Sequence, residues 1–174
     1  TLTEAVGENV VGSPANDTFT GVLSNAGGVD GGTFNAGDRV NGGSGADTLN
    51  LNVTGSSSLP MGASISSVEV INVNLASGAS LAAPLDSSIF AGVQQLWQSD
   101  NDGTDNFADV TVGTGVTAGF RSTGTTAAAT TVTAATGVND VAVALDGVLS
   151  GSNITLAEAM VGDVTSVSVS GSVA

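Results

Sequence analysis

Short apolar runs separated by Gly, Ser and Asn recur along most of this chain. Apolar and small residues alternate in Val141–Leu145 and again in Val167–Val169, and this period of two turns one face of each run towards a core. Such alternation predicts β-strands rather than helices. The runs that predict strands are Val68–Val73, Val93–Trp97, Asp109–Val112, Thr130–Thr133, Val141–Leu145, Asn153–Leu156 and Thr165–Val169.

Helical signals are weak by comparison, because Gly and β-branched residues recur throughout. Leu156–Val161 is rich in good helix formers, and a short helix is kept as an alternative there. Many short strands suit either a β-sandwich or a β-solenoid. A solenoid stacks small side chains rung on rung, and only Trp97 and five Phe residues are aromatic here. We therefore expect an all-β parallel solenoid, with a β-sandwich as the alternative.

Charge narrows the choice of partners. The chain has 16 acidic residues against two basic ones, Arg39 and Arg121, for a formal charge of −14. This charge repels nucleic acid and anionic lipid, so we expect no nucleic-acid partner and no membrane insertion, and cations are the natural ligands. Hydrophobic residues make up 41% of the chain, which favours a folded core over disorder. No apolar stretch approaches the roughly 18 to 20 residues that span a bilayer.

Two zones differ in composition. Residues 1–50 are Gly/Asp-rich and are interpreted as RTX-like calcium-binding turns, whereas residues 51–174 are Thr/Val/Ala-rich and are interpreted as solenoid repeats. Both zones are expected to belong to one continuous domain, which is a fragment of a longer protein. The sharpest motif is GGSGADTLN at 42–50, which fits the nonapeptide G-G-x-G-x-D-x-U-x, where U is a large aliphatic residue. Its glycines allow positive φ angles and close backbone approach. Turn carbonyls and the Asp47 carboxylate can then converge on Ca²⁺.

Two partial copies precede this nonapeptide. The copy at 33–41 lies nine residues upstream and places Asp38 and Val40 at the equivalent positions, without the leading glycines. The copy at 12–20 keeps Asp17 and Phe19, but its offset of 21 residues from the second copy breaks the nine-residue register. For each Asp the alternative is a metal-free turn held by its side chain, and Asp17 has the further alternative of ending a strand.

A second acidic cluster consists of Asp100, Asp102, Asp105 and Asp109. Carboxylates this close repel each other by on the order of 1 kcal/mol per pair in water, unless a cation or solvent relieves them. Counted from Gln98, three of these residues match EF-hand positions three, five and twelve, but Gln98 replaces the leading Asp and no helices flank the loop. A calcium loop of another kind and a solvated turn both stay open.

The chain resembles RTX proteins, which are calcium-binding bacterial exoproteins exported by type I secretion. The likeness rests on VGSPANDTF at 11–19 and VNGGSGADTLNL at 40–51. The following ISSVEVINV at 65–73 and the Thr/Ala/Val-rich repeats make it most similar to RTX-containing surface-layer (S-layer) proteins and large adhesins. It departs from the family in having one complete nonapeptide instead of a tandem block.

The resemblance implies secretion to the extracellular cell surface and calcium-dependent folding, with Ca²⁺ as the cofactor of a calcium-stabilised parallel β-solenoid (a β-helix or β-roll). Self-association into a lattice or filament follows, with a cell-surface polysaccharide as a further candidate partner. By motif position, the implied ligands are the carboxylates of Asp47 and Asp38 together with carbonyls near Gly43, Gly45, Asn35 and Gly37.

Catalytic residue types are scarce. Without His, Cys, Lys or Tyr, the chain lacks imidazole bases, thiol nucleophiles and the usual zinc ligands, so we expect no enzyme. The leading hypothesis is a structural constituent of a surface layer. The alternatives are an adhesin or exoprotein module that binds a glycan, receptor or partner chain, and, less favoured, a carbohydrate-active enzyme domain. Trp97 is interpreted as a packing residue at a solenoid end or in a core, and both arginines as partners of nearby carboxylates.

Overall fold

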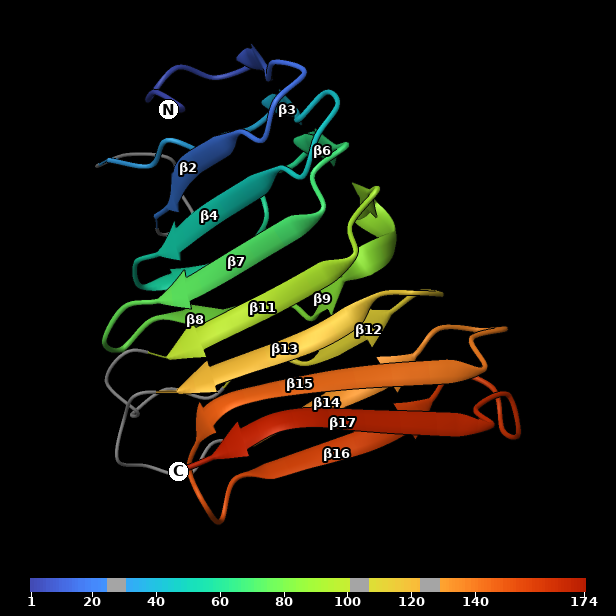
Figure 1. The fold of residues 1–174 in the computed structure, drawn as a ribbon. Coiled ribbons are helices and arrows are strands. Elements are labelled where there is room, and N and C mark those ends of the chain that lie inside the picture. The colour runs from blue at the N-terminus through green and yellow to red at the C-terminus, as the bar shows by residue number, and fades with distance from the viewer. Residues whose placement is uncertain (25–30, 101–106, 123–128) are drawn as a thin grey trace.

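The computed structural model describes residues 1–24, 31–100, 107–122 and 129–174, and these wind into a β-solenoid of about five turns, here called coils (Figure 1). Within these residues every strand pair is parallel. The β-sandwich alternative is therefore wrong, because a sandwich is built from antiparallel sheets. The expected all-β parallel solenoid is confirmed.

One face of the solenoid is a long sheet that runs from the first described coil to the last (Figure 1). Its strand order is β17-β15-β13-β11-β7-β4-β2. The strands are β2 (Thr18–Leu23), β4 (Thr48–Val53), β7 (Val70–Leu75), β11 (Gln95–Asp100), β13 (Thr117–Ser122), β15 (Asp140–Val148) and β17 (Ser166–Val173).

Shorter sheets close the other sides. The first coils use β1 (Asn9–Val11), β3 (Arg39–Asn41), β6 (Ser64–Ser66) and β10 (Phe90–Ala91). The later coils use β9 (Leu85–Asp86), β12 (Val110–Val112), β14 (Ala129–Ala134) and β16 (Asn153–Glu158). A third side pairs β5 (Ser56–Ser57) with β8 (Ser80–Leu81), and η1 (Ser87–Ile89) is a single 3-10 turn.

Coils stack with an offset that changes along the chain. Thr18 pairs with Thr48, 30 positions later, whereas Thr48 pairs with Val70, 22 positions later. The side chains of paired residues nevertheless keep the same direction, since each strand alternates inward and outward. One inward row of the long sheet contains Phe19, Leu49, Ile71, Leu96, Ala118 and Val143.

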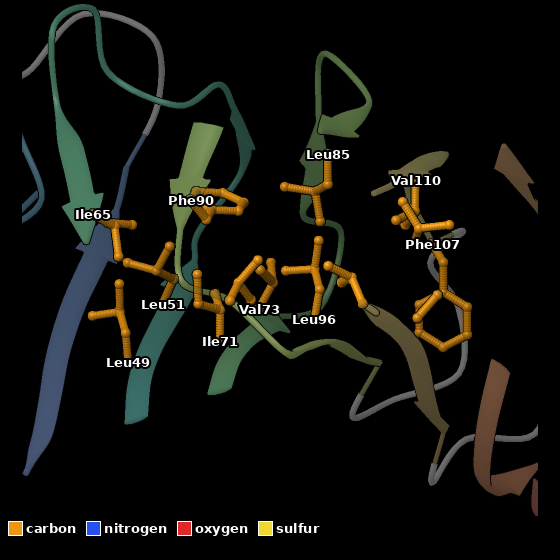
Figure 2. Packing of buried hydrophobic residues seen from close by; sticks show 14 of the residues in the cluster. Leu49, Leu51, Ile65, Ile71, Val73, Leu85, Phe90, Leu96, Phe107 and Val110 are labelled. Carbon is orange, nitrogen blue, oxygen red and sulfur yellow. The ribbon is translucent and has the colours of Figure 1, made fainter. Parts of the chain in front are cut away.

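These rows fill the interior with apolar side chains from all sides (Figure 2). Leu49, Ile71 and Leu96 are completely buried. On the outward side of the long sheet the amide of Asn72 donates to Asn50 Oδ1 (2.8 Å), and the amide of Asn74 donates to Asn52 Oδ1 (3.1 Å). Stacked coils thus place apolar side chains in register inside and amides in register outside.

The seven predicted strands are confirmed, with ends shifted by up to a few residues, as β7, β11, β12, β14, β15, β16 and β17. The alternative of a short helix at 156–161 is wrong. Leu156 belongs to β16 and pairs with Val132 of β14, so the parallel ladder outweighs the helix propensity of this segment. Strand β13 was not expected from the sequence.

Candidate calcium-binding turns

The complete nonapeptide forms the turn that joins β3 to β4. Gly43 and Gly45 have φ angles of +96° and +130°, in the region that favours glycine. At Gly42 the reason is space, since a β-carbon there would lie 1.9 Å from the backbone oxygen of Ser67 in the next coil. The glycines of the motif are therefore required by the backbone path and by the close stacking of coils.

Asp47 closes this turn and is completely buried. Its Oδ1 accepts a hydrogen bond from the backbone N–H of Asp17 in the preceding coil (2.7 Å). Its own backbone N–H donates to Glu69 Oε2 in the following coil (2.8 Å). Its Oδ2, by contrast, has no hydrogen-bond partner among the described residues.

Asp38 is also completely buried, but both of its carboxylate oxygens have partners. Oδ1 accepts from the backbone N–H of Glu8 (2.8 Å), and Oδ2 accepts from that of Asn35 (2.6 Å). Gly37, with a φ angle of +78°, directs its carbonyl oxygen towards the Arg39 guanidinium (3.4 Å). These bonds hold the turn before β3 through the Asp38 side chain.

The two predicted ligands Asp38 and Asp47 lie on different sides of one coil. Asp38 directly precedes β3 and Asp47 directly precedes β4. The nine-residue spacing therefore leads from one corner of a coil to the next corner, and not from one coil to the next coil. The stacking neighbours of Asp47 are Asp17, 30 residues earlier, and Glu69, 22 residues later. Sequence reasoning missed Glu69. The segment LNLNV at 49–53 recurs as INVNL at 71–75, and Asp47 and Glu69 each lie two residues before it. This recurrence could have identified Glu69 from the sequence.

Asp17 caps its own turn before β2. Its Oδ2 accepts from both the backbone N–H and the hydroxyl of Ser13, at 2.6 and 2.9 Å. This is the side-chain turn that the sequence left as an alternative for such residues. The backbone N–H of Asp17 therefore bonds Asp47 in the next coil, while the Asp17 carboxylate accepts hydrogen bonds from Ser13 within its own turn.

The second acidic cluster is described in part. Asp100 is buried at the end of β11, whereas Asp109 is exposed and its Oδ1 accepts from the backbone N–H of Thr131 (2.7 Å). Asp102 and Asp105 lie outside the described residues. Within the described ranges no three acidic side chains are grouped as metal ligands usually are.

Trp97 lies on the outer face of the long sheet, so its interpretation as an end or core residue is wrong. Its ring occupies the space that a side chain at Gly119 would fill, 2.2 Å from the position of a β-carbon there. The guanidinium carbon of Arg121 lies 4.8 Å from the ring centroid, and Arg121 Nε forms an ion pair with Asp146 (2.7 Å). The expected pairing of Arg121 with a carboxylate is confirmed.

No family model, curated protein or solved structure matches this chain. In the described part of the chain no helix has the length and apolarity needed to cross a membrane.

Two oxygen atoms from adjacent coils lie close together beside Gly42. A β-carbon on Gly42 would lie 2.4 Å from Asp47 Oδ2 and 1.9 Å from the Ser67 carbonyl oxygen, so both oxygens approach the same point of the backbone. Carboxylate and carbonyl oxygens are the ligands that Ca²⁺ prefers. Of these two aspartates, Asp47 has a buried oxygen without a hydrogen-bond partner among the described residues, whereas each oxygen of Asp38 accepts a backbone N–H.

Proposed function

We propose that this chain is a secreted structural constituent of a bacterial surface layer, stabilised by calcium and assembling by self-association, without catalytic activity. The observation that carries the proposal is the buried Asp47 Oδ2, which lacks a hydrogen-bond partner among the described residues and lies at a nonapeptide turn of a parallel solenoid. The secretion and the surface-layer role are inferred from the nonapeptide and from its resemblance to RTX surface-layer proteins.

Burial of the Asp47 oxygen without a hydrogen-bond partner has a cost in free energy. A buried acceptor without a partner costs about 1–3 kcal/mol, and more when the group is charged. A calcium ion on Asp47 would remove this cost in the folded state. Because the ion binds the folded chain, it would stabilise that chain by about 2.7 kcal/mol at a hundredfold excess over Kd.

We predict that calcium raises the melting temperature of the chain and that EGTA reverses the effect. The variant Asp47→Asn keeps an acceptor for the Asp17 N–H but loses the charge, so most of the calcium-dependent shift should disappear. Thermal melts followed by circular dichroism, with and without EGTA, measure this.

Asp163→Asn is the matched control. The Asp163 carboxylate accepts the backbone N–H of Gly137 in the neighbouring coil (2.7 Å), as that of Asp47 accepts the backbone N–H of Asp17, but Asp163 is only half-buried, so water reaches its side chain. This variant should keep the calcium shift. A wild-type melt unchanged by chelator, or an equal shift in Asp47→Asn, would contradict the calcium site.

The surface-layer role is tested separately by electron microscopy. Ordered two-dimensional sheets should form when calcium is added to the purified protein. A monodisperse monomer that binds a glycan under the same conditions would instead favour an adhesin.

A further inference from the structure

The outward face of the long sheet is uncharged over several neighbouring strands. Strands β2, β4 and β7 contain no charged residue, and the charged residue of β11 is the buried Asp100. The chain as a whole has a formal charge of −14. Figure 1 shows these strands side by side, with the shorter sheets behind them. Because β4, β7 and β11 each have a paired strand on both sides, this part of the face lies within the stack and not at an end of it.

Four asparagines lie on this face in two rows. Asn50 and Asn72 form one row and Asn52 and Asn74 form the other, and in each row one amide N–H bonds the Oδ1 of its neighbour. An amide has two N–H donors and an oxygen with two lone pairs, so one such bond uses part of its capacity. All four residues are half-exposed. The rows therefore offer hydrogen-bonding groups to a ligand at the spacing of neighbouring strands, about 4.8 Å.

Trp97 continues the row of Asn50 and Asn72 on the next strand, since it pairs with Asn72. Its indole N–H donates to Gln95 Oε1 (2.9 Å), and its ring lies against Gly119 of β13. Trp97 is half-buried, so solvent reaches part of it. The row thus combines amides with an aromatic ring, against which the C–H groups of a ligand can pack.

Arg121 and Asp146 lie next to the Trp97 ring. The guanidinium carbon of Arg121 is 4.8 Å from the ring centroid, and the Arg121 and Asp146 side chains, joined by their ion pair, are 41% and 57% exposed. A guanidinium carries five N–H donors, and a carboxylate carries several acceptor sites. The aromatic ring is therefore flanked by amides on one side and by an exposed donor and acceptor on the other.

This chemistry suits a neutral polysaccharide. Sugar hydroxyl groups both donate and accept hydrogen bonds, and the C–H groups of a sugar ring pack on aromatic rings. An anionic polymer would be repelled by the charge of −14. An apolar protein surface would remove water from the amides without replacing their hydrogen bonds, which is costly. A linear polysaccharide repeats along its length, as the rows of a solenoid repeat from coil to coil.

We infer that a neutral linear polysaccharide binds along the outward face of the long sheet, across β4, β7, β11 and β13. Asn50 and Asn72 bond its hydroxyl groups, and Trp97 packs against a sugar ring. Arg121 and Asp146 bond the hydroxyl groups of a neighbouring sugar. This inference goes beyond the proposed function, because it requires neither a calcium ion nor a lattice.

Intrinsic fluorescence tests the site directly, because Trp97 is the single Trp of a chain without Tyr. The purified chain is titrated with three neutral polysaccharides, which are hydroxyethyl cellulose, galactomannan and dextran. At least one should shift the Trp97 emission to shorter wavelength in a saturable way, since a sugar ring displaces water from the indole. Carboxymethyl cellulose has the same backbone as hydroxyethyl cellulose but is anionic, and it should cause no shift.

Asn72→Ala removes an amide from the row and keeps the fluorescent reporter. Its dissociation constant for the bound polysaccharide should rise about tenfold, as loss of a hydrogen bond at a desolvated contact does. Asn153→Ala is the matched control, because it removes an exposed amide from β16 in another sheet, and it should bind as the wild type does. In affinity electrophoresis Trp97→Phe should stay retarded by the polysaccharide, whereas Trp97→Ala should not.

The absence of an emission shift with all three neutral polysaccharides overturns the inference. So does a stronger response to carboxymethyl cellulose than to hydroxyethyl cellulose, or equal weakening in Asn72→Ala and Asn153→Ala. The two proposals fail separately. A chain that binds a neutral polysaccharide but shows no calcium effect on its melting would leave this site standing and refute the calcium-dependent function, and a calcium-stabilised chain that binds none of the three would do the reverse.

Discussion

At the scale of single residues, the acidic side chains of this protein act as hydrogen-bond acceptors at the corners of the solenoid. The carboxylates of Asp38, Asp47, Glu69, Asp109 and Asp163 each accept a backbone N–H from a neighbouring coil. Corner N–H groups lack sheet partners, and buried ones need an acceptor. Part of the acidic composition thus has a structural explanation that is independent of any metal.

Glycine at position 42 has an equally specific role, and we predict that Gly42→Ala destabilises the fold by about 1–3 kcal/mol, as overpacking of a tight contact does. The added methyl group would overlap the Ser67 oxygen and Asp47 Oδ2. The control is Gly113→Ala, where the nearest atom is the Ser87 hydroxyl at 3.4 Å and the contact is ordinary. Urea unfolding of both variants measures the difference, and equal unfolding midpoints would contradict the prediction.

At the scale of elements, side-chain hydrogen bonds in the turns at the corners hold the ends of the strands in place. The turn between β16 and β17 is held by Glu158, whose Oε1 accepts from the Gly162 N–H (2.9 Å) and whose Oε2 accepts from the Val164 N–H (3.1 Å). These bonds, that from Gly162 first, hold the pKa of Glu158 below its usual value. The charged carboxylate therefore favours the turn that starts the last strand of the long sheet.

This pKa shift predicts how the stability of the turn depends on pH. Because the pKa is lower in the folded state, the contribution of Glu158 is present above its unfolded pKa and is lost as the pH falls through the folded pKa. Wild type should melt at a higher temperature than Glu158→Gln at pH 6, and this gap should close as the pH falls below about 4.3.

The control for the pH series is Glu4→Gln, which removes the same charge from an exposed side chain near the other end of the chain. Comparison of the two variants separates the loss of the Glu158 hydrogen bonds from the loss of one negative charge. A gap between wild type and Glu158→Gln that is constant from pH 6 to pH 3 would refute the role of the carboxylate.

At the scale of the whole molecule, the solenoid is a stack in which each coil is stabilised by its neighbours. Inner coils bury their apolar rows between two others, as Leu96 does between Ile71 and Ala118. The last coil has a neighbour on one side within the described residues, and Leu156 there is 42% exposed. In such quasi-one-dimensional folds stability is close to a sum over coils and their contacts.

We therefore predict a gradient of mutational cost along the stack. Leu96→Ala should cost about 2–5 kcal/mol, as truncation of a buried leucine does. Leu156→Ala should cost less than about 1.5 kcal/mol, because its side chain is only part-buried. Urea unfolding at protein concentrations that keep the chain monomeric measures both, and similar losses at the two positions would argue against the gradient.

The amino-acid sequence alone determined the class of fold and the positions of many turns. Alternation in Val141–Leu145 identifies strands, and the small apolar side chains favour a solenoid because they fit rows repeated from coil to coil. The glycines of the nonapeptide mark a turn whose backbone only glycine can follow, as the φ angles of Gly43 and Gly45 show. These features depend on residues that are close in the sequence, so the sequence pattern predicts them.

The tertiary structure decided which turns stack and which strands pair. The offset between coils changes from 30 to 22 residues, so no constant period reveals that Asp17, Asp47 and Glu69 lie in one column while Asp38 lies at another corner. Strand β13 was missed because Gly119 interrupts its pattern, and Gly119 is explained only by the Trp97 ring of the adjacent strand. The register depends on contacts between distant residues, and those contacts exist only once the coils have stacked.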